Sequence, residues 1–435
     1  MMNKKFKILT YGCQMNVAES ERMAGQLAKI GYTATDDIET ADLILINSCC
    51  VRATAEDKIY GKIGELKRYK LQNPALILGV LGCLAQKDGD ALIKHHPHVD
   101  FVLGTARRSE LPAVIKNFES ARKKVVDTSN VSGQIVEGEI SPIRSSNVSA
   151  FVPIMYGCNN FCTYCIVPYV RGRERSRTPQ EIFSEIESAV AAGYKEITLL
   201  GQNVNSYGRD LKSKNFAQLL ADVDKIDGLK RLRFMTSHPK DLSDELIDAM
   251  AHGKNICEHI HLPVQYGSNE ILRKMNRVYT VEKYLNLVKK IRAAIPNISL
   301  TTDLIVGFPG ETETDFKLTL DFLREVKFDM AFTFIYSERT GTPAANFDGK
   351  VDDETKHRRL NELMEVQNKI SLEKNLRLEG QTLEILVEGA SKTDDKIFTG
   401  RTRTNKPVLF KHGAENIGDL INVKINQAQT WLLKA

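Results

Sequence analysis

The sequence lacks any long apolar run. Its longest apolar stretches, at residues 43–46 and 76–81, are far shorter than the roughly 18 residues that a membrane-spanning helix needs. The first residues lead directly into a short strand pattern, without the apolar segment or the cleavage site of a secretory leader. We therefore expect a cytoplasmic protein with no membrane partner.

A strong excess of charge of one sign is also missing. Lys and Arg number 60 against 55 Asp and Glu, and the resulting net charge of +5 neither establishes nor excludes nucleic-acid binding. The hydrophobic fraction of 42% and the charged fraction of 26% are ordinary for a globular protein and exclude general disorder. At 435 residues the chain is too long for one core, so several domains are expected.

Strand and helix patterns divide the chain into three domains and one linker. Residues 3–120 alternate short apolar runs with amphipathic stretches, which predicts a parallel α/β domain. Residues 121–147 predict a linker because most of this stretch is rich in Ser, Asn, Gly and Glu and lacks periodicity. Residues 148–375 repeat a strand and a helix and predict an incomplete (β/α)6 barrel. Short alternating runs in residues 376–435 predict a small β-barrel.

Local signals place the elements within these domains. Thr178, followed by Pro179 and Glu181, is typical of the start of a helix, and a charged helical pattern at residues 352–376 closes the barrel region. The expected strands are residues 6–11, 42–47, 75–81 and 101–103 in the first domain, 151–155, 197–200, 232–235, 259–262, 300–305 and 330–335 in the barrel, and 382–387, 396–403, 408–410 and 420–425 in the last domain.

Three cysteines, Cys158, Cys162 and Cys165, stand close together directly after the first barrel strand. In a reducing compartment, metal binding or catalysis explains cysteines better than structural disulfides do. Thiolates select iron–sulfur clusters or zinc. Structural zinc needs a fourth ligand, and the next histidine along the chain, His238, is more than seventy residues further on. A cluster on three cysteines instead leaves one iron open as a reaction site.

The spacing Cys-x3-Cys-x2-Cys resembles the radical S-adenosylmethionine (SAM) superfamily. The resemblance implies a [4Fe–4S] cluster whose open iron binds the amino and carboxylate groups of SAM and whose reduction cleaves SAM to a 5′-deoxyadenosyl radical. It also implies that Tyr164 packs against the adenine, although a buried core tyrosine is the alternative.

Short segments rich in Gly, Pro and polar residues follow four of the later barrel strands, where a barrel places its chemistry. Singly, such segments only mark turns. In register with the cysteine loop, they resemble a SAM pocket. The cofactor-binding candidates are Tyr164, Gly201, Gln202, Asn203, Ser237, Gln265 and Asp303.

Three further cysteines, Cys13, Cys49 and Cys83, each follow a predicted strand of the first domain. Because parallel strands end at one edge of a sheet, these residues can converge on a second metal site. The alternative is that each cysteine is simply a small buried residue. Cys50 leaves the identity of the middle ligand open, and Cys257 is interpreted as a non-ligand.

The motifs around these cysteines resemble the amino-terminal domain of the methylthiotransferase family, and the resemblance covers the whole chain. It implies that Cys13, Cys49 and Cys83 hold an auxiliary [4Fe–4S] cluster that carries or supplies sulfur. The motifs are Tyr11-Gly12-Cys13-Gln14-Met15-Asn16, Asn47-Ser48-Cys49 and Leu81-Gly82-Cys83.

Two basic regions suggest an RNA substrate. Arginine binds phosphate bidentately, although a charge run is more commonly a solvated face. The last domain resembles a TRAM domain, a small RNA-binding barrel, with Phe398 and Phe410 among its basic residues. The candidates for RNA contact are Arg171, Arg173, Arg175 and Arg177 after the cysteine loop, and Lys392, Arg401 and Arg403, with Lys396, Lys406 and Lys411, in the last domain.

Within the methylthiotransferase family, Cys13-Gln14-Met15-Asn16 resembles the branch that modifies carbon 2 of isopentenyladenosine at position 37 in the tRNA anticodon loop. The resemblance implies one SAM as methyl donor, a second as radical source, an external electron donor and a sulfur or cluster-repair source. A monomer suffices. Related enzymes acting on threonylcarbamoyladenosine or a ribosomal protein remain alternatives, as does a non-catalytic iron–sulfur RNA-binding protein.

Overall fold

The computed structural model describes residues 4–50, 53–130, 141–392 and 394–435. Contacts within the chain divide it into two compact units, which are described separately. The first unit contains Met1–Ser145, Pro153–Phe161 and Cys165–Arg177, and the second contains Ser146–Val152, Cys162–Tyr164 and Thr178–Ala435. Among the described residues, no helix combines the length and apolar character needed to cross a membrane.

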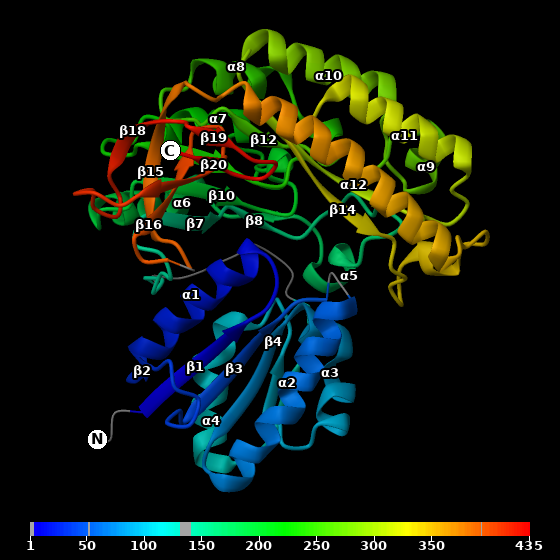
Figure 1. Ribbon diagram of the computed structural model, residues 1–435. Helices are drawn as coiled ribbons and strands as arrows, with labels where there is room; N and C mark the ends of the chain where they lie inside the picture. Colours follow the sequence, from blue (N-terminus) through cyan, green and yellow to red (C-terminus); the bar gives the residue numbers. More distant parts are fainter. Residues whose placement is uncertain (1–3, 51–52, 131–140, 393) are drawn as a thin grey trace. The chain divides into compact units, whose positions relative to one another are not determined.

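The first unit is built on a six-stranded parallel sheet in the order β2-β1-β3-β4-β5-β6 (Figure 1). The direction in which strands are added reverses between β1 and β3, which is the kind of position where open α/β sheets bind ligands. The strands are β1 (Lys4–Thr10), β2 (Tyr32–Ala34), β3 (Leu43–Ser48), β4 (Ile77–Gly82), β5 (Phe101–Leu103) and β6 (Val125–Asp127). The helices are α1 (Gln14–Lys29), α2 (Ala53–Gln72), α3 (Cys83–His95), η1 (Arg108–Glu110) and α4 (Leu111–Ala121).

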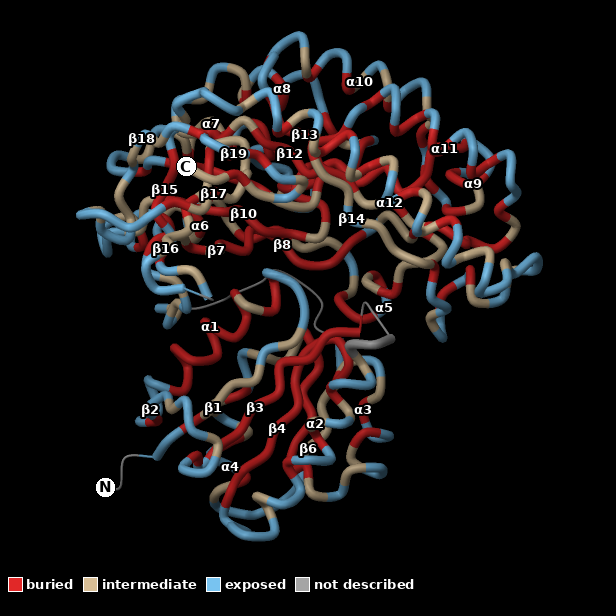
Figure 2. The backbone as a smooth tube through the Cα atoms, in the orientation of Figure 1, coloured by how far each residue is buried: buried red, intermediate tan, exposed pale blue. Residues whose placement is uncertain are grey.

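Both faces of this sheet are buried under helices, as the red interior strands in Figure 2 show. In β3, Leu43 and Leu45 pack in one core with α1 and α4, whereas Ile44 and Ile46 pack in another with α2 and α3. This alternation explains why residues 43–46 of β3 are all apolar: each of these side chains faces a core. The first unit also includes β8 (Met155–Tyr156), α5 (Val167–Arg171) and β9 (Arg175–Ser176).

The barrel of the second unit consists of two three-stranded sheets, ordered β11-β10-β7 and β12-β13-β14. Its strands are β7 (Ser149–Pro153), β10 (Glu196–Leu200), β11 (Arg231–Phe234), β12 (His259–His261), β13 (Ser299–Val306) and β14 (Met330–Ile335). Its helices are α6 (Pro179–Ala191), η2 (Val204–Ser206), α7 (Phe216–Val223), η3 (Pro239–Asp241), α8 (Asp244–His252), α9 (Asn269–Lys274), α10 (Val281–Ala294), α11 (Glu313–Val326), η4 (Pro343–Asn346) and α12 (Asp353–Leu376).

Capping explains where several barrel helices begin. The Thr178 hydroxyl accepts a hydrogen bond from the Glu181 backbone N–H, and the Glu181 carboxylate accepts one from the Thr178 backbone N–H, so α6 starts with the predicted cap.

In strand β13, Leu304 and Val306 are fully buried, whereas Asp303 and Ile305 are partly exposed. The strand therefore directs one row of side chains toward the helices and the other toward the barrel interior.

The terminal β-domain is a curled six-stranded sheet in the order β18-β15-β16-β17-β20-β19. Its small core includes Ile385, Val408, Phe410 and Leu433. The strands are β15 (Thr382–Ala390), β16 (Ile397–Thr402), β17 (Pro407–Lys411), β18 (Leu420–Lys424), β19 (Gln427–Ala428) and β20 (Leu433–Lys434).

Buried arginines join the terminal β-domain to the barrel. Arg231 and Arg233 lie at the amino-terminal end of β11, and their guanidinium groups donate hydrogen bonds to backbone carbonyls at the end of β16. Arg233 also donates to the Glu196 carboxylate at 2.7 Å. The terminal domain is thus attached to the end of the barrel opposite the carboxyl ends of its strands.

The predicted α/β fold class is confirmed, with a parallel amino-terminal sheet, an incomplete barrel and a small terminal β-domain. The expected strands of all three domains form at nearly the expected residues. The sequence patterns did not indicate β2, β6, β19 or β20, which have two or three residues each and are too short to show periodicity. Of these, β6 extends the first sheet into residues that were interpreted as linker.

We predict that Arg233→Ala destabilises the protein by about 3–5 kcal/mol, because it leaves the buried Glu196 carboxylate without its charged partner. Urea unfolding measures the change. Arg273→Ala is the matched control, since Arg273 is an exposed arginine paired with Glu270 on a helix surface and its removal should cost at most about 0.5 kcal/mol. Equal losses of stability in the two variants would contradict the role given to the buried Arg233 side chain.

Candidate functional site

The cysteines of the first domain follow three neighbouring strands whose ends are aligned. Thr10 of β1 pairs in register with Asn47 of β3, and Asn47 pairs with Leu81 of β4. Two or three residues beyond this row stand Cys13, Cys49 and Cys83. The three cysteines therefore gather at the carboxyl edge of the sheet, where the strand order reverses.

Gly12 allows the turns that carry Cys13 and Cys49 to approach closely. It has a φ of +130°, and a Cβ atom placed on it would lie 2.6 Å from the Cβ atom of Cys49. Any larger residue would push the two turns apart. Gly12 is thus needed both for its own turn and for the close approach of Cys49.

Asn16 ties the same two turns together. Its fully buried side chain donates to the backbone carbonyls of Tyr11 and Ser48, at 3.1 and 3.0 Å. Its Oδ1 atom accepts a hydrogen bond from the Cys13 thiol at 3.4 Å. One amide side chain therefore positions the strand ends on either side of the reversal point.

Cys49 and Cys50 occupy different environments. Cys49 lies against Gly12, whereas Cys50 belongs to the apolar core below α2 and α3 and its thiol contacts Cys83. The hydrogen bond with Cys50, together with the charge of Arg171, lowers the pKa of the Cys83 thiol to about 7 against the effect of burial. The same hydrogen bond and burial raise the pKa of Cys50 well above its usual value. Cys50 is thus the thiol that donates.

The second cysteine motif starts in a tightly closed loop. Gly157 has a φ of +80°, and a Cβ atom there would lie 2.1 Å from the backbone carbonyl oxygen of Arg173. The next residue, Cys158, donates its backbone N–H to the carbonyl of Gly172. Cys158 is buried and Cys165 is partly exposed.

Within the second unit, Cys162 lies beside a buried arginine. Arg277 donates to the Cys162 sulfur at 3.4 Å and to the carbonyl of Pro263 at 2.8 Å. Although burial alone would lower it, the neighbouring Tyr279, Tyr164 and Cys162 raise the pKa of Arg277 well above its usual value. A permanent positive charge next to a sulfur ligand stabilises the thiolate that an iron–sulfur cluster needs. Tyr164 itself is only partly buried.

Polar atoms without partners mark the carboxyl ends of β10 and β11. Within the described residues, Asn203 Oδ1, both amide atoms of Asn205 and Ser237 Oγ are buried and make no hydrogen bond. Such atoms are rare in folded proteins unless a ligand or water completes them. Two of them belong to predicted cofactor residues, Asn203 and Ser237. This set fits a polar ligand such as SAM.

Backbone conformation also singles out these strand ends. Thr236 and Gln265 have φ values of +69° and +77°, in a region that residues with side chains seldom adopt. Such strain is retained where surrounding structure imposes it, commonly at ligand sites. Gln265 bonds through its backbone to Asp303 and Ile305, which fixes it against β13. Of the remaining predicted cofactor residues, Gly201 is buried and Gln202 half-buried at the end of β10.

The barrel interior holds a polar row that the sequence motifs did not reveal. His259 and His261 of β12 each contact the Thr301 hydroxyl at 3.0 Å, and the second ring nitrogen of His261 lies 3.4 Å from the Asp303 carboxylate. The half-exposed ring of Phe332 packs edge-on against His261. Asp303, a predicted cofactor residue, is thus oriented by a neighbouring strand. A His-x-His strand pattern was the available signal.

The arginine segment after the cysteine loop does not act as one RNA-binding surface. Arg171 and Arg177 are buried: Arg171 pairs with Glu19, and Arg177 donates to the Pro153 carbonyl. The prediction that these two contact RNA is wrong, because their guanidinium groups are used inside the protein. Arg175 is partly buried. Only Arg173 is exposed among the four, and it stacks on Phe161.

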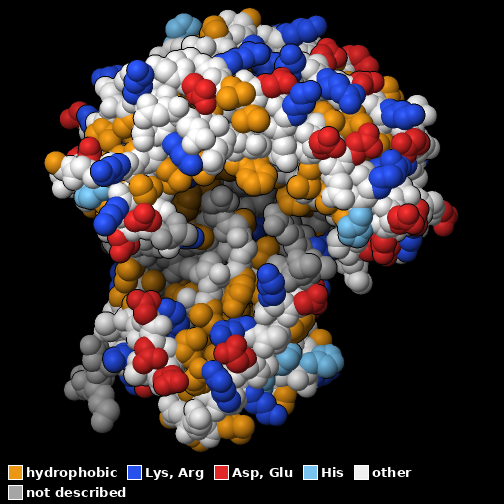
Figure 3. Space-filling model, viewed as in Figure 1, with side chains coloured by type: hydrophobic (Ala, Val, Ile, Leu, Met, Phe, Trp, Pro, Cys, Tyr) orange, Lys and Arg blue, Asp and Glu red, His pale blue; other side chains and the backbone are white. Residues whose placement is uncertain are grey.

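The basic residues of the terminal β-domain also divide into two groups. Arg403 binds Glu258 bidentately at the barrel junction, and Lys406 pairs with Asp329 in the same region. Arg401 pairs with Glu388 on the domain surface. Of the predicted basic residues, Lys392, Lys396 and Lys411 are exposed and form no ion pair within the described part of the chain. Close to them in sequence, the Phe398 and His412 rings stack at 3.8 Å. On the face shown in Figure 3, basic and acidic side chains are otherwise interspersed.

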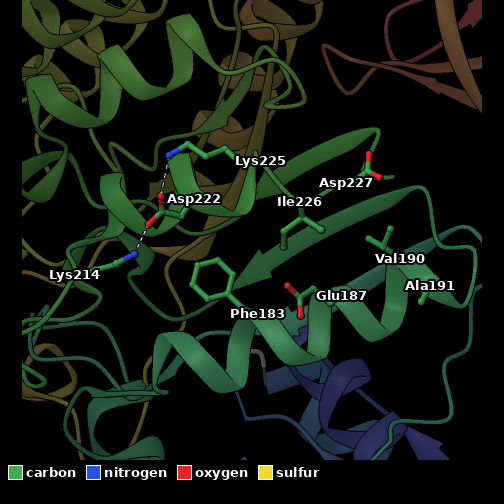
Figure 4. Close-up of a pocket in the computed structure, with 9 residues that line it drawn as sticks. All are labelled: Phe183, Glu187, Val190, Ala191, Lys214, Asp222, Lys225, Ile226 and Asp227. Atoms are coloured by element: carbon green, nitrogen blue, oxygen red, sulfur yellow. Dashed lines mark hydrogen bonds and ion pairs between the residues drawn. The ribbon is translucent and has the colours of Figure 1, made fainter.

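A groove of about 570 Å³ lies on the outer surface of the barrel, beside α6 (Figure 4). Asp222 stands between Lys214 and Lys225 and pairs with both. The groove contains none of the predicted site residues and is separate from the strand ends.

In the described ranges, no group of three or more His, Cys, Asp or Glu side chains is arranged to hold a metal ion. Ligands of a cluster bind different iron atoms and need not converge on one point.

Comparison with known proteins identifies the three domains. Residues 5–104 match the Uncharacterized protein family UPF0004, residues 152–323 the Radical SAM superfamily, and residues 376–435 the TRAM domain. The chain is 56% identical to the tRNA-2-methylthio-N(6)-dimethylallyladenosine synthase of Carboxydothermus hydrogenoformans, over 100% of this chain and 99% of that protein. The chain belongs to this synthase family. The Clostridium novyi synthase is 54% identical over 99% of this chain and 96% of its own length.

These matches confirm the resemblance drawn from the cysteine motifs, and the chain is a radical SAM enzyme. The family implies SAM and [4Fe–4S] clusters as cofactors. Among solved structures, a radical SAM methyltransferase, TsrM from Kitasatospora setae, matches with a TM-score of 0.59 and 15% identity, over 79% of this chain and 74% of that one. The cobalamin-dependent radical enzyme OxsB matches with a TM-score of 0.53 and 13% identity, over 85% and 56%. At these identities the likeness shows the fold alone.

Substitution distinguishes the adjacent cysteines. We predict that Cys49→Ala removes about half of the bound iron, whereas Cys50→Ala leaves the iron content near that of the parent because its thiol packs in the core. Iron and sulfide analysis of the reconstituted full-length variants measures this difference. Cys257→Ala is the control, since Cys257 is a buried thiol whose pKa burial raises to about 11. Loss of iron in Cys50→Ala alone would reverse the assignment.

Buried His238 makes stability depend on pH. Burial, with help from Arg277 and Lys240, lowers the pKa of His238 to about 2, so the ring stays neutral in the folded state while it is protonated below about pH 6.5 after unfolding. Stability should therefore fall with pH below 6.5, by about 1.4 kcal/mol per pH unit from this group. His238→Gln should reduce that slope in urea unfolding between pH 7 and 5. His252→Gln, at an exposed histidine, should leave it unchanged.

Proposed function

We propose that this enzyme methylthiolates carbon 2 of N6-dimethylallyladenosine at position 37 of tRNA, using two SAM molecules and two [4Fe–4S] clusters. The observation that carries the proposal is the full-length identity of 52–56% to three synthases named for this product. The placement of Cys13, Cys49 and Cys83 at one carboxyl edge of the first sheet supports it. In the overall reaction a C–H bond is replaced by a C–S bond, and the hydrogen leaves on 5′-deoxyadenosine.

The residues assigned to the two clusters are Cys158, Cys162 and Cys165 in the radical site and Cys13, Cys49 and Cys83 in the auxiliary site. When bound, the radical-site cluster supplies the electron that cleaves SAM. The protein's own contribution is to fix the thiolates: Asn16 positions two auxiliary turns, and Arg277 donates to the Cys162 sulfur. Buried cationic donors next to sulfur ligands fit clusters better than a neutral pocket would.

SAM would be held at the carboxyl edge of the barrel. Asn203, Asn205 and Ser237 provide buried polar atoms that lack partners within the described chain. Asp303, positioned by His261, provides a carboxylate that faces the barrel interior and accepts hydrogen bonds. The half-exposed Phe332 ring, next to His261, offers a surface on which an adenine base can stack.

RNA binding is assigned to the exposed part of the TRAM domain and to Arg173. Lys392, Lys396 and Lys411 are available for phosphates, and the stacked Phe398 and His412 rings lie on the same domain. Such contacts position RNA without reading its bases. We further propose a monomer in the cytoplasm that receives electrons from an external donor and sulfur from a separate source, as a multi-turnover sulfur-inserting enzyme requires.

Anaerobic incubation of the reconstituted protein with SAM, dithionite and tRNA carrying N6-dimethylallyladenosine should yield 5′-deoxyadenosine and the 2-methylthio nucleoside, detected by mass spectrometry. Cys158→Ala should abolish both, because it removes a ligand of the radical site. Formation of 5′-deoxyadenosine with unchanged tRNA would refute the substrate, and product on threonylcarbamoyladenosine tRNA or a ribosomal protein would identify the alternative. Absence of 5′-deoxyadenosine would refute the hypothesis that the protein cleaves SAM by a radical reaction.

A further inference from the structure

We propose that Arg171 is a positioning residue of the auxiliary cluster site, where its buried guanidinium fixes the Cys13 turn and raises the reduction potential of the cluster. The inference rests on the proposed assignment of Cys13, Cys49 and Cys83 to that cluster. It gives a role to an arginine that the sequence pattern had assigned to RNA.

The contacts of Arg171 lead directly to the ligand turn. Its Nη1 atom donates to Glu19 at 2.5 Å, and its Nη2 atom donates to Asn16 Oδ1 at 3.1 Å. The Nδ2 atom of the same side chain donates to the backbone carbonyls of Tyr11 and Ser48, which lie just before Cys13 and Cys49. Arg171 therefore fixes the orientation of the side chain that joins two ligand turns.

Burial makes this charge effective. The Arg171 side chain is 4% exposed and the Glu19 side chain 0%, so solvent screens neither group. Arg108 also pairs with Glu19, so two guanidinium groups share this carboxylate. Although burial would lower it, the neighbouring charges of Cys83, Glu19 and Cys13 raise the pKa of Arg171 well above its usual value, so the guanidinium stays charged. A cluster held by three thiolates carries a net negative charge, so a nearby buried cation favours its binding and its reduction.

The helix that carries Arg171 is fixed in the first unit. Ile166 and Val170 pack in the apolar core with α2 and α3, and the Thr105 hydroxyl donates to the Val170 carbonyl at 2.5 Å. Cys165 stands six residues before Arg171. The segment that ends the radical-site motif is therefore anchored, through the ion pair of Arg171 with Glu19, to helix α1, which directly follows Cys13.

Charge changes of opposite sign test the proposal. The full-length protein with Cys158, Cys162 and Cys165 all changed to Ala keeps only the auxiliary cluster, whose midpoint potential can be measured by a redox titration followed by electron paramagnetic resonance. In this background Arg171→Met should lower the potential, Glu19→Gln should raise it, and Arg171→Lys should restore most of the loss. A purely structural role predicts the same direction for Arg171→Met and Glu19→Gln, because both break one ion pair.

Arg144→Met is the matched control. Arg144 is as buried as Arg171 and pairs with Glu21, which lies on α1 like Glu19. Glu21 is about 200° around that helix from Glu19, so Arg144 lies on another side of α1. Its removal should leave the potential unchanged. If Arg171→Met binds no iron, the midpoint potentials of Glu19→Gln and Arg171→Lys still test the proposal. An unchanged or lowered potential in Glu19→Gln overturns it. If the background protein itself binds no iron, the auxiliary assignment fails instead, which separates the two hypotheses.

Discussion

The site depends first on the alignment of parallel strand ends. In the first sheet, β1, β3 and β4 are hydrogen-bonded in a register that places Thr10, Asn47 and Leu81 in one row. Cysteines that are tens of residues apart in the chain thus reach the same edge, at the point where the strand order reverses. The turns after that row, held by Gly12 and Asn16, then set how closely the thiols approach one another.

A second constraint is the electrostatic cost of gathering thiolates inside a protein. Two buried arginines lie next to these cysteines: Arg171 donates to Glu19 and to Asn16 beside the Cys13 turn in the first unit, and Arg277 donates to the Cys162 sulfur in the second. Neither guanidinium is placed by the cysteine spacing itself. Each lies in a segment some distance from the thiolate it serves, so the cationic surroundings of both sites are produced by the fold.

The cysteine sets and the three-domain fold could be predicted because their signals are local. Alternating apolar runs mark strands, and the Cys-x3-Cys-x2-Cys spacing is a compact motif. The roles of arginines could not be predicted in this way. Arg171 and Arg173 are two residues apart in one basic segment, yet one is buried against Glu19 and the other is exposed. Burial depends on contacts with residues distant in the sequence, as it does for His261 and Asp303.

The junction between β11 and the terminal β-domain has a consequence for cooperativity. Arg231 and Arg233 are buried in the barrel, but carbonyl groups supplied by the terminal domain accept most of their hydrogen bonds. The hydrogen bonds of these two arginines therefore form only when the last domain is folded against the barrel. If either part unfolds, the two guanidinium groups lose their partners or become exposed to solvent. The TRAM domain therefore contributes to the stability of the barrel, and a truncation that removes it would leave two buried arginines of β11 without their carbonyl partners.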